Sequence, residues 1–113
     1  MNHEIKKISK IIDELATFCL LHGAKLMNMS IENNEDYFKI TLDIDNIDST
    51  NKRVKRLEEL LNCPRQSEME EFYWELTGES DHDSELSMVG MMVDKAKLEY
   101  VGNSLKMILY RYK

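Results

Sequence analysis

Three side chains of types that take part in enzyme chemistry fall close together in the sequence, Glu14, Cys19 and His22. A glutamate can deprotonate or orient water, and a cysteine three residues before a histidine in a helix could form a nucleophile and its base. Cys19, however, belongs to the apolar stripe of its helix, which favours a buried thiol over a reactive one. We interpret His22 as a cap of the helix end, where a cation complements the helix dipole. Glu14 is either an exposed helix carboxylate or a catalytic base.

A second cluster of charged side chains lies between Glu79 and Glu85, in a stretch that predicts a loop. His82 stands between Asp81 and Asp83, and this combination could supply ligands to a divalent cation. Adjacent loop residues seldom converge on one ion without further ligands. We therefore favour a solvated acidic loop over a metal site.

One predicted helix contains three aromatic residues in succession, Phe72, Tyr73 and Trp74, which cannot all face one core. Trp74 falls on the side away from the apolar face of that helix, among acidic side chains. It either packs on a neighbouring loop or anchors a protein partner, a role for which tryptophan is enriched. We predict that Trp74, Glu71 and Glu75 bind a partner, with the carboxylates steering a basic surface.

The helix that carries Glu14 is predicted from His3 to His22. Its apolar residues recur at spacings of three and four, the pattern of a helix that packs against a core. They are Ile5, Ile8, Ile11, Ile12, Leu15, Phe18 and Cys19. Gly23 supplies the left-handed residue that lets the chain turn back. Alternating apolar and polar residues then predict two strands, Lys25 to Ile31 and Phe38 to Ile44, joined by a polar turn.

Three further helices follow in the sequence pattern. The first carries apolar residues from Val54 to Leu61 and ends before Pro64. The second opens on a capping-box spacing and runs from Ser67 to Gly78. The third is predicted over Leu86 to Val93, although periodicity alone does not separate a helix from a strand there. Gly90 would allow this helix to pack closely against a neighbour.

A closing hairpin pairs residues 97–101 with residues 105–112 across a Gly102-Asn103 turn. The element order is therefore α-β-β-α-α-α-β-β. This order predicts an α+β fold, a two-layer sandwich with helices packed on one face of a four-stranded mixed sheet. The length fits a single domain over residues 1–113.

The composition is that of a globular protein, with 42% apolar and 32% charged residues. No apolar run is long enough to cross a membrane, and the N-terminus lacks the apolar segment of a signal peptide, so we expect a cytoplasmic protein. Cys19 and Cys63 both fall in apolar helical patterns, as small buried thiols do in a reducing compartment. A net charge of −6 disfavours general nucleic-acid binding, which needs an excess of lysine and arginine.

The stretch ELATFCLLHG, from Glu14 to Gly23, resembles the N box of the histidine-kinase-like ATPase (GHKL) superfamily, especially the small anti-sigma-factor serine kinases. In that family the box is followed by the same strand, turn and strand. The run from Leu86 to Asp94, followed by the Gly-Asn hairpin, is similar to the family's final helix and closing strands. The resemblance covers both ends of the chain, and it implies an ATPase-like scaffold with a variable lid between them.

The positions that would bind nucleotide depart from the family pattern. Phe18 stands where the family has its Mg²⁺-binding asparagine, and a phenyl ring offers no oxygen to magnesium. Glu14 takes the position of the family's general base. Asp45 reaches the adenine-reading position only with a one-residue slip, and no glycine follows it. Asp83 and Glu85 stand in the phosphate-binding loop, where carboxylates repel a triphosphate.

The sequence therefore predicts a degenerate ATPase-like domain without tight binding of ATP or magnesium. We expect a non-catalytic regulatory or protein-binding module whose partner is another bacterial regulatory protein. The alternative is a divergent ATP-binding serine-protein kinase of the anti-sigma-factor type. In that case Glu14 would be the catalytic base, Asp45 the cofactor-binding residue, and ATP with Mg²⁺ the cofactor. A structural homo-oligomer subunit is a third class, and a homodimer is compatible with all three.

Overall fold

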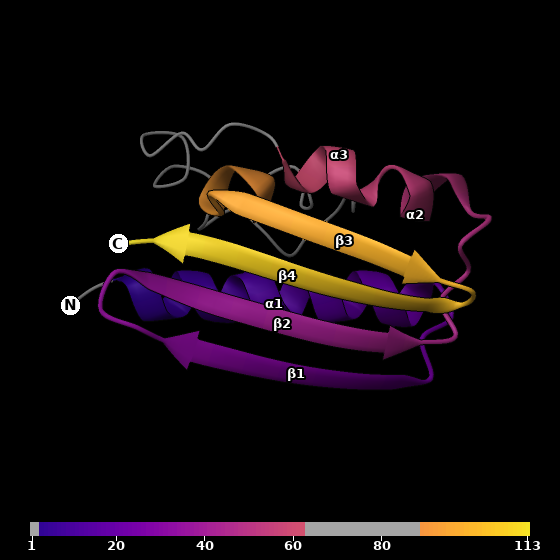
Figure 1. The fold of residues 1–113 in the computed structure, drawn as a ribbon, viewed down its shortest axis with the longest axis horizontal. Coiled ribbons are helices and arrows are strands. Elements are labelled where there is room, and N and C mark those ends of the chain that lie inside the picture. Colours follow the sequence, from indigo (N-terminus) through magenta and orange to yellow (C-terminus); the bar gives the residue numbers. More distant parts are fainter. Residues whose placement is uncertain (1–2, 63–88) are drawn as a thin grey trace.

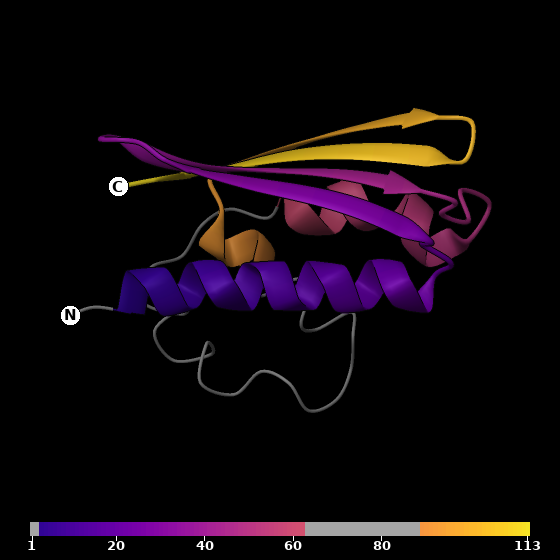
Figure 2. The same ribbon diagram turned by 90° about the horizontal axis from the view of Figure 1, so that it is seen from below.

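Four strands form one sheet, and the helices gather on one of its faces (Figure 1, Figure 2). The computed structural model describes residues 3–62 and 89–113. Its helices are α1 (His3–Leu21), α2 (Lys52–Lys55) and α3 (Leu57–Leu61). Its strands are β1 (Leu26–Asn33), β2 (Tyr37–Asp45), β3 (Lys95–Val101) and β4 (Ser104–Tyr112). The predicted α+β class is confirmed.

The sheet has the order β1-β2-β4-β3, and each neighbouring pair of strands is antiparallel. It is therefore antiparallel throughout, whereas the sequence predicts a mixed sheet. β2 and β3 do run in the same direction, since each is antiparallel to β4. The crossover that joins them leaves the width of one strand between them, and β4 turns back from β3 into that gap. The two parallel strands are consequently never neighbours.

The segment that follows β2 differs from the prediction in detail. The sequence predicts one helix over Val54 to Leu61, and the structure has two short ones, which meet at Arg56 (φ −88°, ψ −2°). Asn51 caps the first, because its side-chain oxygen accepts two backbone N–H bonds at 2.8 and 3.3 Å. Residues 89–92 are helical, within the range predicted for the third helix. The helix predicted over residues 67–78 lies outside the described residues.

The core lies between α1 and the face of the sheet that α1 covers, which we call the inner face (Figure 2). Alternate residues of β2 and β4 are buried there, as the predicted alternation requires. The principal core residues are Ile8, Ile11, Leu15, Phe18 and Cys19 of α1, Phe38, Ile40, Leu42 and Ile44 of β2, and Leu105, Met107 and Leu109 of β4. Ile5, which the sequence assigns to the same stripe, is exposed. The buried face of α1 is centred on Ile11 and Leu15, about a quarter turn away from it.

Both ends of α1 are fixed by specific residues. Gly23 adopts φ 103°, the left-handed conformation that the sequence predicts, and the chain turns there toward β1. Near the other end, the buried Arg111 of β4 donates to both carboxylate oxygens of Glu4, each at 2.9 Å. The same guanidinium donates to the carbonyl oxygen of Met92. Arg111 therefore connects α1, β4 and the helical residues 89–92.

Candidate functional site

α1 carries the predicted catalytic base and the residue that replaces a magnesium ligand. Glu14 is 7% exposed, so it is not the exposed carboxylate that the sequence allows. Phe18 is a core residue, and its ring centroid lies 4.2 Å from that of His22. Nδ1 of His22 lies 2.8 Å from the Phe18 carbonyl oxygen, an acceptor to which the nitrogen donates. This bond supports the interpretation of His22 as a helix cap.

Cys19 lies in the core beside these residues. Burial raises the pKa of its thiol to about 12. A thiol with so high a pKa stays protonated at neutral pH and does not act as a nucleophile. The prediction that Cys19 is buried is confirmed.

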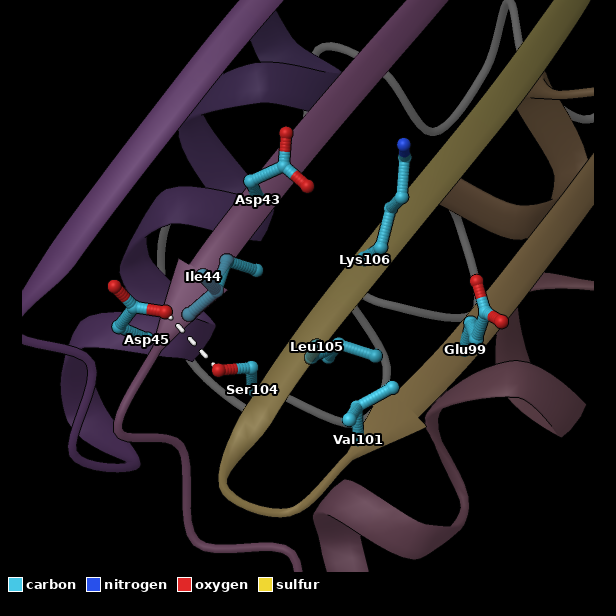
Figure 3. A pocket seen from close by; sticks show the side chains of 8 residues that line it. All are labelled: Asp43, Ile44, Asp45, Glu99, Val101, Ser104, Leu105 and Lys106. Carbon is cyan, nitrogen blue, oxygen red and sulfur yellow. Dashed lines mark hydrogen bonds between the residues drawn. The ribbon is translucent and has the colours of Figure 1, made fainter.

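Asp45, which the kinase alternative assigns to adenine, ends β2 on the outer face of the sheet, beside a shallow hollow (Figure 3). Its carboxylate accepts a hydrogen bond from the hydroxyl of Ser104 at 3.0 Å. The hollow has a volume of about 220 Å³. It is lined by Asp43, Ile44, Asp45, Glu99, Val101, Ser104, Leu105 and Lys106.

The charges in this hollow complement one another. The strand register places Lys106 of β4 between Asp43 of β2 and Glu99 of β3, and opposite charges on neighbouring strands attract. A phosphate chain would meet three carboxylates and a single ammonium there, so repulsion would dominate. The Ser104 hydroxyl donates to a carboxylate, and no histidine of the described residues lines the hollow to act as a base. The arrangement suits a charged protein surface better than an anionic nucleotide.

The structure does not bring Glu14 and Asp45 together. α1 packs on the inner face of the sheet, whereas Asp45 belongs to the outer face (Figure 2, Figure 3). The sheet therefore lies between the two carboxylates. Within residues 3–62 and 89–113, no group of three or more His, Cys, Asp and Glu side chains is placed to hold a metal ion.

An apolar surface that the sequence analysis does not identify lies at the β1 edge of the sheet. The inner-face residues of β1 are Met27, Met29 and Ile31, opposite the buried Ile44, Leu42 and Ile40 of β2. Met29 is nevertheless 38% exposed and Ile31 is 51% exposed. The reason is the position of α1, which lies behind β2 and β4 and leaves the outermost strand uncovered (Figure 1).

α1 adds a second row of apolar side chains to this surface. The helical spacing puts Ile5, Ile12 and Leu20 on one flank of α1. Ile5 is 69% exposed and Leu20 is 62% exposed, while Ile12 packs partly against the core. α2 and α3 lie toward β3 (Figure 1), so among the described elements no other helix lies beside α1 on the β1 side of the sheet. We call the surface formed by Ile5, Leu20, Met29 and Ile31 the apolar ledge.

Two sequence signals point to the ledge in retrospect. Leu20 falls outside the predicted apolar stripe of α1, so its side chain has no place in the core. In a sheet that adds its third strand to one side of the first hairpin, only one of the two hairpin strands gains a new neighbour. The other hairpin strand then lies at the edge of the sheet. The sequence does not say which member that is, because β4 comes from the far end of the chain.

The predicted partner-binding residues Trp74, Glu71 and Glu75 lie outside the described residues, as does the acidic loop over residues 79–85. Their role in binding stays a prediction. Among the described residues, the apolar ledge is the candidate for a contact surface.

The fold and this surface define the class: a two-layer α+β domain with an open apolar edge. No helix among the described residues is long and apolar enough to cross a membrane. Comparisons with protein-family models, with curated proteins and with solved structures give no match to this chain. The relation to the histidine-kinase-like ATPases stays a hypothesis that rests on the sequence motifs.

Proposed function

We propose that this chain is a non-catalytic regulatory module that binds another protein, and that the apolar ledge is part of the contact surface. The observation that carries the proposal is the exposure of Met29 and Ile31 on a strand that pairs on one side only within the described residues, together with the exposure of Ile5 and Leu20 on α1. A contiguous exposed apolar surface rimmed by polar residues is typical of a protein interface. The separation of Glu14 from Asp45 also favours binding over phosphoryl transfer.

The ledge supports a specific mode of binding. An edge strand presents the N–H and C=O groups of alternate residues, so a strand from a partner can extend the sheet. Met29 and Ile31 would then contact the apolar side chains of the added strand. Methionine is flexible and polarizable, and it can adapt to the shape of a partner.

The resemblance to anti-sigma-factor kinases implies the kind of partner, a bacterial regulatory protein such as a sigma factor or its antagonist. We include this partner class in the proposal on the strength of the sequence motifs. Trp74, Glu71 and Glu75 would add an aromatic anchor and negative charge to the interface.

The proposal is tested by capture of partners from a lysate of the source organism. The tagged wild-type chain is compared with an Ile31→Lys variant, which puts a charge on the ledge. The matched control is Val101→Lys, because Val101 is a β-branched residue, 69% exposed, on the opposite edge strand. We expect the wild type and Val101→Lys to retain a specific partner that Ile31→Lys loses.

Capture of the same proteins by Ile31→Lys and by the wild type would contradict the role of the ledge. A Trp74→Ala variant in the same experiment tests the predicted anchor separately. If Trp74→Ala captures the wild-type set of proteins, Trp74 is not part of the interface.

A further inference from the structure

The two edges of the sheet differ in how well they are protected against further strand pairing. β3 carries Lys95, Lys97 and Glu99 on its outer face, and its Tyr100 hydroxyl donates to the carbonyl oxygen of Val54, which ties this edge to α2. Charged side chains and a covering element are the usual protection of an edge strand. β1 has eight residues, contains no proline, and has Glu32 as its single charged residue. Within residues 3–62 and 89–113, β1 is thus the edge that remains open to another strand.

The sequence of β1 is complementary to itself. Two antiparallel copies of one strand keep their inner faces on the same side only if odd-numbered residues face odd-numbered residues. With Met29 opposite Met29 of the second copy, Met27 faces Ile31. All six inner-face apolar side chains then face one another. A shift of this register by two residues, with Ser30 on the two-fold axis, would set Met27 against Asn33 instead.

The charges agree with the same register. Glu32 faces Leu26 of the second copy, and Asn28 faces Ser30, so no like charges meet. This matters because each chain carries a net charge of −6, which opposes any contact between two copies, and this register adds no facing like charges to that repulsion.

We propose that two copies of this chain pair through β1, antiparallel and with a two-fold axis at Met29, to give one eight-stranded sheet. The inference rests on the proposed function only in treating the ledge as a contact surface. Because neighbouring strands lie roughly 4.8 Å apart, the inner faces of the two β1 strands adjoin. The ledges of the two copies become one longer apolar surface. In this dimer the free edge of β1 is taken by the second copy, so a partner would contact the side chains of the joined ledges and would not extend the sheet at β1.

The first test is the oligomeric state by sedimentation over a wide range of concentrations. We expect the wild type to have twice the mass of the 13.3 kDa chain. Met29→Lys and Met29→Glu should each weaken the dimer by about tenfold or more, because each puts two like charges on the axis. A mixture of the two variants should recover the dimer. Val101→Lys is the control and should dimerise as the wild type does.

The second test fixes the register by disulfide formation in a Cys63→Ser background, where the remaining Cys19 is buried. Met29→Cys should form a covalent dimer on oxidation, because residues opposite each other lie about 4.5–5.5 Å apart. Ser30→Cys should not, since its two copies would be diagonal neighbours about 7–8 Å apart.

A monomeric wild type at all concentrations would overturn the inference, and so would efficient cross-linking of Ser30→Cys but not Met29→Cys. A monomeric wild type that still captures a partner would overturn this inference and leave the proposed function in place. Because Ile31 faces Met27 of the second copy in this register, the sedimentation of Ile31→Lys is measured beside its partner capture, so that loss of the dimer and loss of the partner are told apart. A dimer that survives both Met29 variants would show that the copies meet elsewhere, and it would likewise overturn the inference.

Discussion

Gly90 shows how a single hydrogen atom can decide a packing contact. A Cβ at this position would overlap with the carbonyl oxygen of Leu60 in α3, which confirms the expectation of close packing. Gly90→Ala should therefore lower the free energy of unfolding by about 1–3 kcal/mol, the usual cost of overpacking. Urea unfolding followed by circular dichroism measures the change.

The control for Gly90 is Gly102→Asn in the β3–β4 turn. Gly102 has φ 60°, which asparagine tolerates, and no atom lies within 4 Å of an added Cβ. This variant should stay close to wild-type stability. Equal losses in the two variants would refute the packing explanation for Gly90.

The burial of Cys19 should make the stability of the protein depend on pH in the alkaline range. Burial raises its pKa from the ordinary 9.0 to about 12. Above pH 9 the unfolded chain releases this proton while the folded chain keeps it, so the free energy of unfolding falls as pH rises from about 9 to about 12. In a Cys63→Ser background, a Cys19→Ala variant should lose less stability over this pH range. If the free energy of unfolding fell equally with pH in both proteins, Cys19 would not be the source of the pH dependence.

Among the elements, an ion pair adds to the apolar packing of α1 on β4. Arg111 is buried and bonds Glu4 through two nitrogens. Glu4→Gln leaves the guanidinium with a neutral acceptor, and we expect a loss of about 1–3 kcal/mol in thermal or urea unfolding. The comparison variant is Glu59→Gln, because Glu59 and Arg56 form an exposed pair at 3.9 Å. Exposed pairs contribute about 0–1 kcal/mol, so similar losses in the two variants would argue against this view of Glu4.

The elements were predictable to the extent that their signals are local. The period of α1, the alternation in β2 and β4 and the glycine turns give the helix, the strands and their approximate ends. The break at Arg56 was not predictable, since both short helices carry the same apolar pattern. The exposure of Ile5 also escaped the sequence, because a stripe shows which residues share a face and not where the helix lies over the sheet.

At the scale of the whole molecule, the opposite positions of Glu14 and Asp45 lead to a prediction about nucleotide. A ligand at a hundred times its dissociation constant stabilises a protein by about 2.7 kcal/mol. We expect the melting temperature with Mg²⁺ and ATP to be the same as the melting temperature with Mg²⁺ alone. Micromolar affinity in calorimetry, lost on Asp45→Asn, would reverse this expectation and favour the kinase alternative.

The candidate site was less predictable than the fold. Phe18 and Cys19 were assigned correctly from their places in an apolar stripe, because burial follows from local periodicity. The relation of Glu14 to Asp45 depends on which face of the sheet each occupies. The ledge depends on the position of β4, which arrives from distant sequence. Such long-range facts follow from topology, and spacing alone does not reveal them.

The position of β4 between β2 and β3 has a consequence for synthesis on the ribosome. Of the four strands β4 is made last, yet it is the one that joins the other three into a sheet. Until it leaves the exit tunnel, the β1–β2 hairpin has no neighbour on either side, and the partner of Glu4 has not been made. The sheet can therefore close only after translation has passed residue 112. Nascent chains should depend on chaperones that shield two open strand edges until that moment.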